Sequence, residues 1–214
     1  MRAAMAKPMV IVSSFEILYN KNGEYHEVLV HEAARCPYCG GALRYRNRKQ
    51  RSVLDELREK IVYLLRRLWC EGCKSLHTEI PDFIQPHRHY SSLVIQDVID
   101  GGGEACAADD STIRRWRNDF EEAKADIEQR LKSVYARETD SHAPFASETK
   151  TLNGLIKRET RWLSYVMWLL IRHGHRPCTR FAFCQREEAV SIAGMAADGG
   201  KGDGFYDNSK EDTG

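Results

Sequence analysis

Four of the seven cysteines in this 214-residue chain stand in two C-x-x-C pairs. The pairs read CPYC and CEGC and comprise Cys36, Cys39, Cys70 and Cys73. A two-residue spacer lets one tight turn aim two sulfur atoms at one ion, and two such pairs complete a tetrahedral Zn²⁺ site. Glycine follows the first pair twice and lies inside the second, which gives both turns backbone freedom. We therefore predict a zinc cofactor held by these four cysteines.

Such a site is expected to be structural, because four thiolates leave no coordination position open to water or substrate. Two other interpretations are free buried cysteines and a thioredoxin-type redox pair. Matched pairs flanked by glycine disfavour the first, and the lack of a βαβ pattern around either pair disfavours the second. Thiolates also suit iron or cadmium, so the pattern indicates a soft metal, with zinc as the expected ion.

The other cysteines and the histidines near the second pair are not expected to bind metal. We interpret the three isolated cysteines as small core residues: Cys106, Cys178 and Cys184. The nearby histidines are expected to lie on the surface or to form hydrogen bonds: His77, His87 and His89.

Positive charge is concentrated between the two cysteine pairs, although the net charge of the chain is only +1. Residues 44–67 carry nine Lys and Arg against three Asp and Glu, whereas acidic residues dominate from 187 onward. Basic segments of this kind attract polyanions, most often nucleic acid. An ordinary solvated face is the alternative. The candidate phosphate contacts are Arg44, Arg46, Arg48, Lys49 and Arg51.

A second basic group stands at the start of a predicted helix. Residues 90–122 have the pattern of a helix-turn-helix, with a short helix, a turn and a second helix. In that motif, residues at the start of the second helix reach base edges in the major groove of double-stranded DNA. The alternative is a plain amphipathic hairpin with a basic face. The connector is longer than the usual 3–4-residue turn of a helix-turn-helix, which makes the pattern less specific. The candidate DNA contacts are Thr112, Arg114, Arg115 and Arg117.

The elements that would position these residues change character along the chain. A β-branched and aromatic run predicts one strand over 9–19, and Asn22–Gly23 is a turn signal before a strand over 25–31. Further strands are predicted over 42–51, 60–69 and 76–80. The stretch 53–64 has mixed periodicity and could be partly helical.

Helical periodicity follows from residue 91. It predicts a helix over 91–100 capped by Ser91 or Ser92, one over 111–136 capped by Asp110 or Ser111, and one over 152–173. The expected fold class is α+β. We predict a β-rich zinc ribbon over 1–89, a helical region over 90–185 that includes the helix-turn-helix, and a disordered acidic tail over 186–214.

Composition excludes some classes of function. With 42% hydrophobic and 29% charged residues, the chain suits a globular protein with a core. Its apolar runs are far shorter than the ~20 residues that span a bilayer, and no export signal is evident, so we expect a cytoplasmic protein without a membrane partner. The sequence contains neither a phosphate loop nor a nucleophile–base pair. We therefore do not expect an enzyme or a small-molecule substrate.

The order of these motifs resembles a bacterial family that carries domain of unknown function 6431. The resemblance rests on CPYCGGAL, RRLWCEGCKSLHTEIPDFIQPHRHYSSLVIQDVID and DSTIRRWR, and covers residues 8–117. The segment is also similar to the zinc-ribbon and helix-turn-helix front ends of some insertion-sequence transposases. That similarity implies a DNA-binding module associated with mobile elements. It assigns zinc to the four paired cysteines and base reading to Thr112, Arg114 and Arg115.

The chain departs from those transposases after residue 117. No alternation of strands and carboxylates typical of an RNase H-like nuclease follows, so transposase activity is not inferred. Two hypotheses remain. The first is a non-enzymatic, zinc-stabilised protein that binds double-stranded DNA, with long helices that could build a homodimer. The second is a zinc-stabilised protein-interaction module that does not contact DNA.

Overall fold

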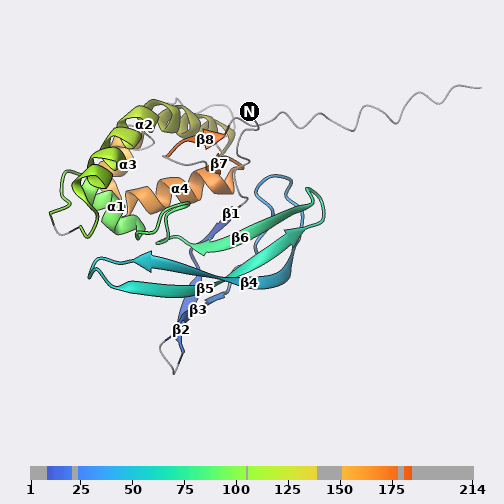
Figure 1. The fold of residues 1–214 in the computed structure, drawn as a ribbon. Coiled ribbons are helices and arrows are strands. Elements are labelled where there is room, and N and C mark those ends of the chain that lie inside the picture. The colour runs from blue at the N-terminus through green and yellow to red at the C-terminus, as the bar shows by residue number, and fades with distance from the viewer. Residues whose placement is uncertain (1–8, 21–23, 105, 139–150, 178–180, 185–214) are drawn as a thin grey trace, which may run out of the picture.

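The fold is α+β, with helices gathered on one face of a curled sheet (Figure 1). The computed structural model describes residues 9–20, 24–104, 106–138, 151–177 and 181–184. The sheet contains β1 (Met9–Val12), β2 (Phe15–Tyr19), β3 (His26–Val30), β4 (Leu43–Leu54), β5 (Lys60–Cys70) and β6 (Ser75–Pro81). The later elements are α1 (Ser92–Ile99), α2 (Asp110–Glu138), α3 (Leu152–Arg158), α4 (Trp162–Arg172), β7 (Arg176–Pro177) and β8 (Phe183–Cys184).

Strand β5 organises the sheet. One edge of β5 pairs antiparallel with β4 along the whole hairpin, from Leu43 opposite Cys70 to Leu54 opposite Lys60. The other edge is shared, because β3 pairs parallel with its first half and β6 pairs antiparallel with its last four residues. Strand β1 then adds parallel to β6, and β2 adds antiparallel to β3. The predicted hairpin around Asn22–Gly23 joins β2 to β3, although residues 21–23 lie outside the described part.

The prediction of one strand over 9–19 is wrong, because the chain bends between β1 and β2. The backbone N–H groups of Ser13 and Ser14 both donate to the Glu32 carboxylate, at 2.7 and 3.0 Å. Those donors are therefore lost to the sheet ladder at the bend. The two strands consequently pair with different neighbours, β6 and β3.

The suggestion of helix within 53–64 is also wrong, since this stretch forms the turn of the β4–β5 hairpin. The Asp55 carboxylate accepts the backbone N–H groups of Leu57 and Glu59, at 3.0 and 2.8 Å. Arg58 takes a left-handed conformation with φ of 64°. An Asx-type turn of this kind satisfies the backbone locally and reverses the chain.

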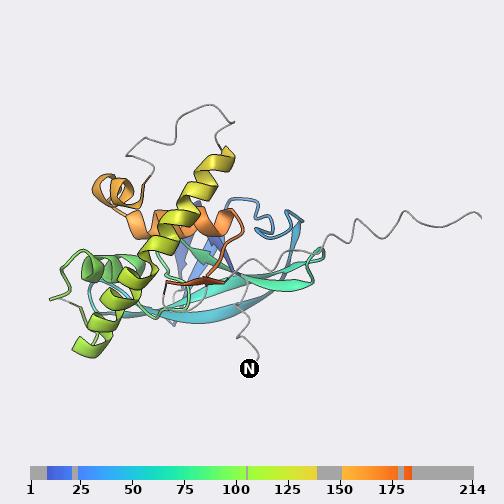
Figure 2. The ribbon, with the colours of Figure 1, turned by 90° about the horizontal axis from the view of Figure 1, so that it is seen from above.

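Helices α1 and α2 begin at hydrogen-bonded caps. The Ser91 hydroxyl accepts the N–H of Val94 at 3.2 Å, as predicted. The cap of α2 is Asp109, one residue before the predicted position, and its carboxylate accepts the N–H of Thr112 at 2.8 Å. Hydrogen bonds from Ser111 and Thr112 hold the pKa of Asp109 down at about 2. Figure 2 shows the length of α2, which lies across α4.

The predicted single helix over 152–173 is two helices, α3 and α4. The side chain of Gln96 on α1 enters the break between them, where its amide donates to Thr160 O at 2.9 Å and accepts from Leu163 N at 3.2 Å. A buried side chain thus takes over backbone groups that a continuous helix would have used. The sequence around the break contains no proline or glycine that would signal it.

One continuous core joins the sheet to the helices. It runs from Ile11, Leu65 and Ile80 in the sheet to Trp116 and Trp162 in the helices, all at most 6% exposed. Trp116 and Trp162 therefore anchor the helices in this core. This core crosses residue 90, where the sequence places a domain boundary; the boundary remains a prediction.

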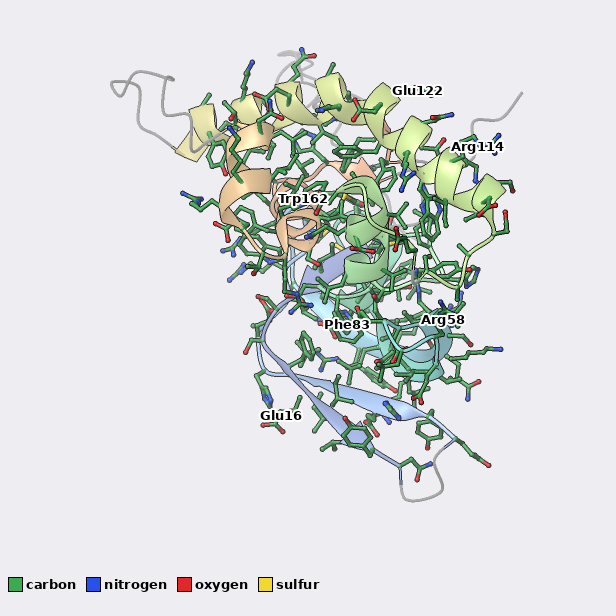
Figure 3. All side chains as sticks on the ribbon, turned by 90° about the vertical axis from the view of Figure 1, so that its left-hand side faces the viewer. Glu16, Arg58, Phe83, Arg114, Glu122 and Trp162 are labelled. Atoms are coloured by element: carbon green, nitrogen blue, oxygen red, sulfur yellow. The ribbon has the colours of Figure 1, made fainter. Side chains whose placement is uncertain are left out.

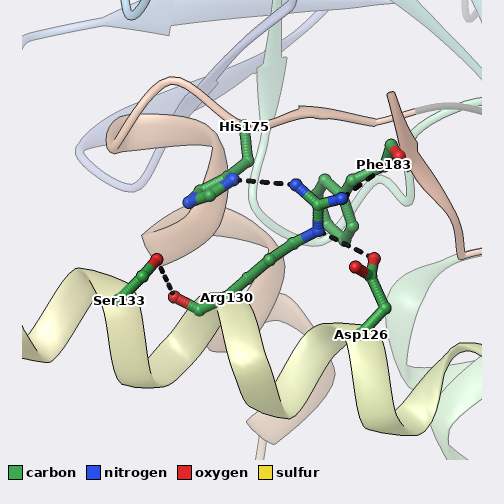
Figure 4. A network of polar contacts seen from close by, with 5 residues as sticks. All are labelled: Asp126, Arg130, Ser133, His175 and Phe183. Atoms are coloured by element: carbon green, nitrogen blue, oxygen red, sulfur yellow. Dashed lines mark hydrogen bonds and ion pairs between the residues drawn. The ribbon is translucent and has the colours of Figure 1, made fainter. Parts of the chain in front are cut away.

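The short β7–β8 hairpin is held against α2 by Arg130 (Figure 4). The Arg130 guanidinium binds Asp126 at 2.7 Å, donates to His175 Nδ1 at 3.1 Å and to Phe183 O at 3.4 Å. It also lies 5.3 Å from the centre of the Phe183 ring.

The predicted tail over 186–214 lies outside the described residues. None of the described helices is long and apolar enough to cross a membrane.

Candidate metal centre

The two cysteine pairs meet at one end of the β4–β5 hairpin. Their four sulfur atoms all lie within 4.8 Å of one another. The two short contacts each join one pair to the other, Cys36 to Cys73 at 3.6 Å and Cys39 to Cys70 at 3.4 Å. A tetrahedral ion with bonds of about 2.3 Å to sulfur separates its ligands by about 3.8 Å. These separations are far longer than the roughly 2.05 Å of a disulfide. The four sulfurs could therefore hold a metal ion together.

Local backbone structure aims the sulfurs inward. In the first turn, Gly40 N donates to Cys36 O at 2.8 Å and Cys36 N donates to Gly41 O at 2.9 Å. The residue after each pair is left-handed, with φ of 70° at Gly40 and 51° at Lys74. In the sheet, Cys70 pairs with Leu43 on one side and with Ser75 on the other. The hairpin register thus brings both turns to the same place.

Two glycines, Gly41 and Gly72, leave little space beside Cys39 Sγ. A Cβ added at Gly72 would lie 3.0 Å from Cys39 Sγ, and one added at Gly41 would lie 3.3 Å from the same atom. Neither glycine has a positive φ, so their role is close approach to sulfur rather than unusual backbone conformation. The glycines and the four soft donors fit a metal ion at this position.

The thiols do not all favour the same protonation state. Burial raises the pKa of Cys36 despite hydrogen bonds from the N–H groups of Tyr38 and Cys39, and burial also raises that of Cys73. For Cys70 burial acts in the same direction, but hydrogen bonds from the Cys73 backbone and neighbouring thiols lower its pKa to about 7. Thiols this close together become thiolates together when a cation compensates their charge.

The structure adds His77 to this centre, a residue not expected to take part. His77 is completely buried on β6, and its Nε2 lies 3.4 Å from Cys36 Sγ and 3.7 Å from Cys73 Sγ. Burial, together with the charge of Arg176, lowers the pKa of His77 to about 4. Strand alternation could have indicated it, because residues 75 and 77 lie on one face of β6, which begins two residues after Cys73.

The centre contacts the helical part of the protein. The Arg176 guanidinium of β7 lies 4.3 Å from the centre of the Tyr38 ring, inside the first cysteine turn. A Cβ added at Gly174, just after α4, would lie 2.8 Å from Pro37 O. The first turn is therefore packed against the end of α4 and the start of β7.

The basic residues predicted on β4 have different surroundings. Four of them are exposed: Arg44, Arg46, Arg48 and Lys49. Arg46 lies over the Trp69 ring at 5.6 Å, and Arg48 forms an ion pair with Glu27. Arg51 instead points into the protein, where one of its nitrogens donates to the carbonyl oxygens of Gln85 and Arg88, each at 2.7 Å. Burial lowers the pKa of Arg51.

The predicted DNA contacts of α2 also differ in whether backbone carbonyl groups already accept hydrogen bonds from their side chains. Arg114 and Arg115 are exposed in its first turns, and Arg115 donates to Thr112 Oγ1 at 3.2 Å. Arg117 donates to Val98 O at 2.9 Å and to Gly102 O at 2.6 Å, so it secures the end of α1. Residues 100–109 connect the two helices. Figure 3 shows Arg114 at the outer end of α2 and Trp162 among the helices.

The remaining predicted residues lie away from the sulfurs. Cys106 is half-buried and packs against the core. Cys178 and the side chain of Cys184 lie outside the described residues. The His87 imidazole lies 3.2 Å from Pro177 O, consistent with the hydrogen-bonding role expected of it, and His89 is exposed.

Comparison with known proteins identifies one family. Residues 36–116 match the family described as Domain of unknown function (DUF6431), which supports the resemblance drawn from the same motifs. The match begins at Cys36 and ends at Trp116, and so includes the sulfur cluster, the β4–β5 hairpin, α1 and the start of α2. No curated protein and no solved structure matches the chain.

Proposed function

We propose that this protein is a zinc-stabilised, non-enzymatic DNA-binding protein, in which the sulfur cluster holds a zinc ribbon and the exposed basic side chains of β4 bind DNA phosphates. The observation that carries the proposal is the juxtaposition of four sulfurs with a strand that exposes Arg44, Arg46, Arg48 and Lys49. Register pairs Leu43 at the start of that strand with Cys70. A metal at the cluster would thus fix the base of the basic strand.

The zinc assignment follows from the donor set. Four thiolates in a tetrahedral arrangement suit Zn²⁺ and leave no position for a reacting water, which is why the proposed role is structural. Binding would supply folding free energy to a region in which two of the four cysteines, Cys36 and Cys70, are buried.

Metal content tests this part of the proposal. We expect one equivalent of zinc per chain in purified protein and its loss in Cys70→Ser, together with loss of cooperative thermal unfolding. Cys106→Ser is the matched control, because Cys106 lies outside the cluster, and it should retain the metal. A wild-type protein that folds without bound metal would contradict the zinc centre.

DNA binding is proposed to be mainly electrostatic. The side chains of β4 offer four exposed cations, of which Arg48 would exchange its Glu27 partner for phosphate. In contrast, Asp109 and Asp110 stand beside the arginines of α2 and weaken the local positive field. The contacts to phosphate are therefore assigned to β4 first, and Arg114 and Arg115 are assigned a secondary role. Arg51 and Arg117 are omitted because backbone carbonyls already occupy their guanidinium groups.

Salt dependence of binding to a mixed-sequence DNA duplex tests the proposal. Four phosphate contacts predict about a hundredfold loss of affinity between about 50 and 200 mM salt. The double variant Arg46→Gln/Lys49→Gln should reduce the slope of log K against log salt by about 1.8. The control is Lys132→Gln/Arg137→Gln, which removes the same charge from exposed positions near the far end of α2. Equal slopes for the two variants would contradict binding by β4.

A protein-interaction module is the second candidate, and exposed apolar residues favour it. Leu18 is 46% and Tyr19 is 75% exposed on the β2–β3 hairpin, which projects away from the helices (Figures 1 and 3). Absence of DNA binding by the zinc-loaded protein at low salt would favour this candidate. Sedimentation analysis of the wild type and of Leu18→Ser/Tyr19→Ser then tests whether the hairpin mediates self-association. The association with mobile elements remains part of the proposal and rests on the sequence resemblance alone.

A further inference from the structure

The imidazole of His77 connects the two cysteine pairs. Its Nε2 lies near one sulfur of each pair, 3.4 Å from Cys36 and 3.7 Å from Cys73. Both distances suit an N–H group directed at sulfur. The donor atoms that all lie within 4.8 Å of one another are the four sulfurs and do not include the His77 nitrogens. The side chain comes from β6, so a third segment of chain reaches the cluster besides the two turns.

Packing fixes the orientation of this ring. His77 is 0% exposed, stands opposite Leu68 on β5, and its ring centre lies 5.4 Å from that of Tyr38. These neighbours leave the ring no solvent to turn toward. The imidazole is therefore held against the sulfurs by the sheet and by the first cysteine turn.

The surroundings of the two ring nitrogens differ and select one tautomer. Nδ1 is buried and has no hydrogen-bond partner among the residues that the structure describes, whereas Nε2 faces two sulfur atoms. A proton on Nδ1 would leave a buried donor unsatisfied and would turn the Nε2 lone pair toward electron-rich sulfur. A proton on Nε2 places the only donor where two acceptors lie.

We propose that His77 is a positioning residue of the metal centre, whose Nε2–H donates to the thiolates of Cys36 and Cys73 and holds the two cysteine pairs at the spacing a single ion requires. The inference rests on the proposed zinc centre and assigns it an additional residue. A donor shared by two thiolates also offsets part of the negative charge that four sulfurs bring to a divalent ion. Partners of this kind typically contribute about 10–100-fold to metal affinity.

Zinc competition with a chromophoric chelator tests the contribution to affinity. His77→Phe keeps an aromatic ring and removes the N–H, so its zinc affinity should fall by about 10–100-fold. His77→Gln retains an N–H donor and should recover part of that loss. The control is His31→Phe, because His31 is exposed and its imidazole faces Glu16 on β2 rather than the sulfurs; its affinity should equal that of the wild type.

Two measurements on the wild-type protein do not depend on a variant that folds. Long-range ¹H–¹⁵N spectra should show the His77 proton on Nε2, and X-ray absorption should show four sulfur ligands at about 2.3 Å. A proton on Nδ1 would overturn the inference. So would a nitrogen ligand at about 2.0–2.1 Å, which would make His77 a ligand.

The outcomes separate this inference from the proposed function. If the wild type binds zinc tightly and His77→Phe binds it equally well, the positioning role is wrong and the zinc centre stands. If the wild type binds no zinc, the proposed centre is wrong, and the role of His77 is wrong with it.

Discussion

At the scale of single residues, identity alone does not reveal role. Arg46 and Arg51 lie five positions apart on the same strand, yet one is exposed over Trp69 and the other donates to two carbonyl groups inside the protein. The difference arises from the strand's position. Residues near the cysteine end of β4 face solvent, whereas those near the hairpin turn meet residues 85–91.

The glycines of the cysteine turns give a graded prediction at this scale. Gly72→Ala should weaken metal binding more than Gly41→Ala, because the added Cβ would lie 3.0 Å rather than 3.3 Å from Cys39 Sγ. Displacing that sulfur by a few tenths of an ångström distorts the tetrahedron. Chelator competition measures both affinities, and the reverse order would contradict the proposed sulfur geometry. Neither substitution introduces backbone strain, since neither glycine has a positive φ.

At the scale of elements, side chains decide where strands and helices end. Glu32 takes two backbone donors between β1 and β2, and Gln96 takes backbone groups between α3 and α4. Each of these side chains is distant in sequence from the break that it stabilises. Hydrophobic periodicity describes the segments correctly on both sides of each break, but it contains no information about a distant partner.

Arg51 gives a prediction about how the elements are joined. Its guanidinium secures the segment around Gln85 and Arg88 to β4, so Arg51→Met should lower the free energy of unfolding by about 1–3 kcal/mol, as expected when buried carbonyls lose their donor. Urea denaturation measures this change. The salt dependence of DNA binding should stay at the wild-type slope, in contrast to Arg46→Gln/Lys49→Gln. A reduced slope in Arg51→Met would return this residue to the DNA-binding set.

At the scale of the whole molecule, the sulfur cluster is joined to the helices rather than isolated at the end of a hairpin. The first cysteine turn packs against Gly174 and Arg176. The hydrophobic core is continuous from the sheet to α2 and α4. Order at the cluster should therefore affect segments more than a hundred residues away in sequence.

Metal removal tests this connection. Chelation should increase amide hydrogen exchange at both cysteine turns and also over residues 170–177, while the turn at residues 55–59 should change least because Asp55 stabilises it locally. Mass spectrometry of the exchanged peptides gives the comparison. Uniform exchange over the entire chain would show that the protein unfolds as one unit, and exchange confined to the cysteine turns would contradict the coupling to α4 and β7.

The local pattern of the sequence was sufficient for several features. The spacing of the cysteine pairs indicated a shared metal centre, and alternation and helical periodicity located most strands together with α1 and α2. These features depend on contacts between near neighbours, or on chemistry that a short motif carries in full. The caps were predicted to within one residue for the same reason.

Tertiary structure alone decided which residues meet across long separations. It brought His77 to the sulfurs, turned Arg51 and Arg117 toward carbonyl groups, and placed Gln96 in the break before α4. Each of these side-chain positions depends on how the strands and helices pack against one another. Burial and hydrogen bonding between distant segments have no period along the chain, so they emerge only when the segments are packed together.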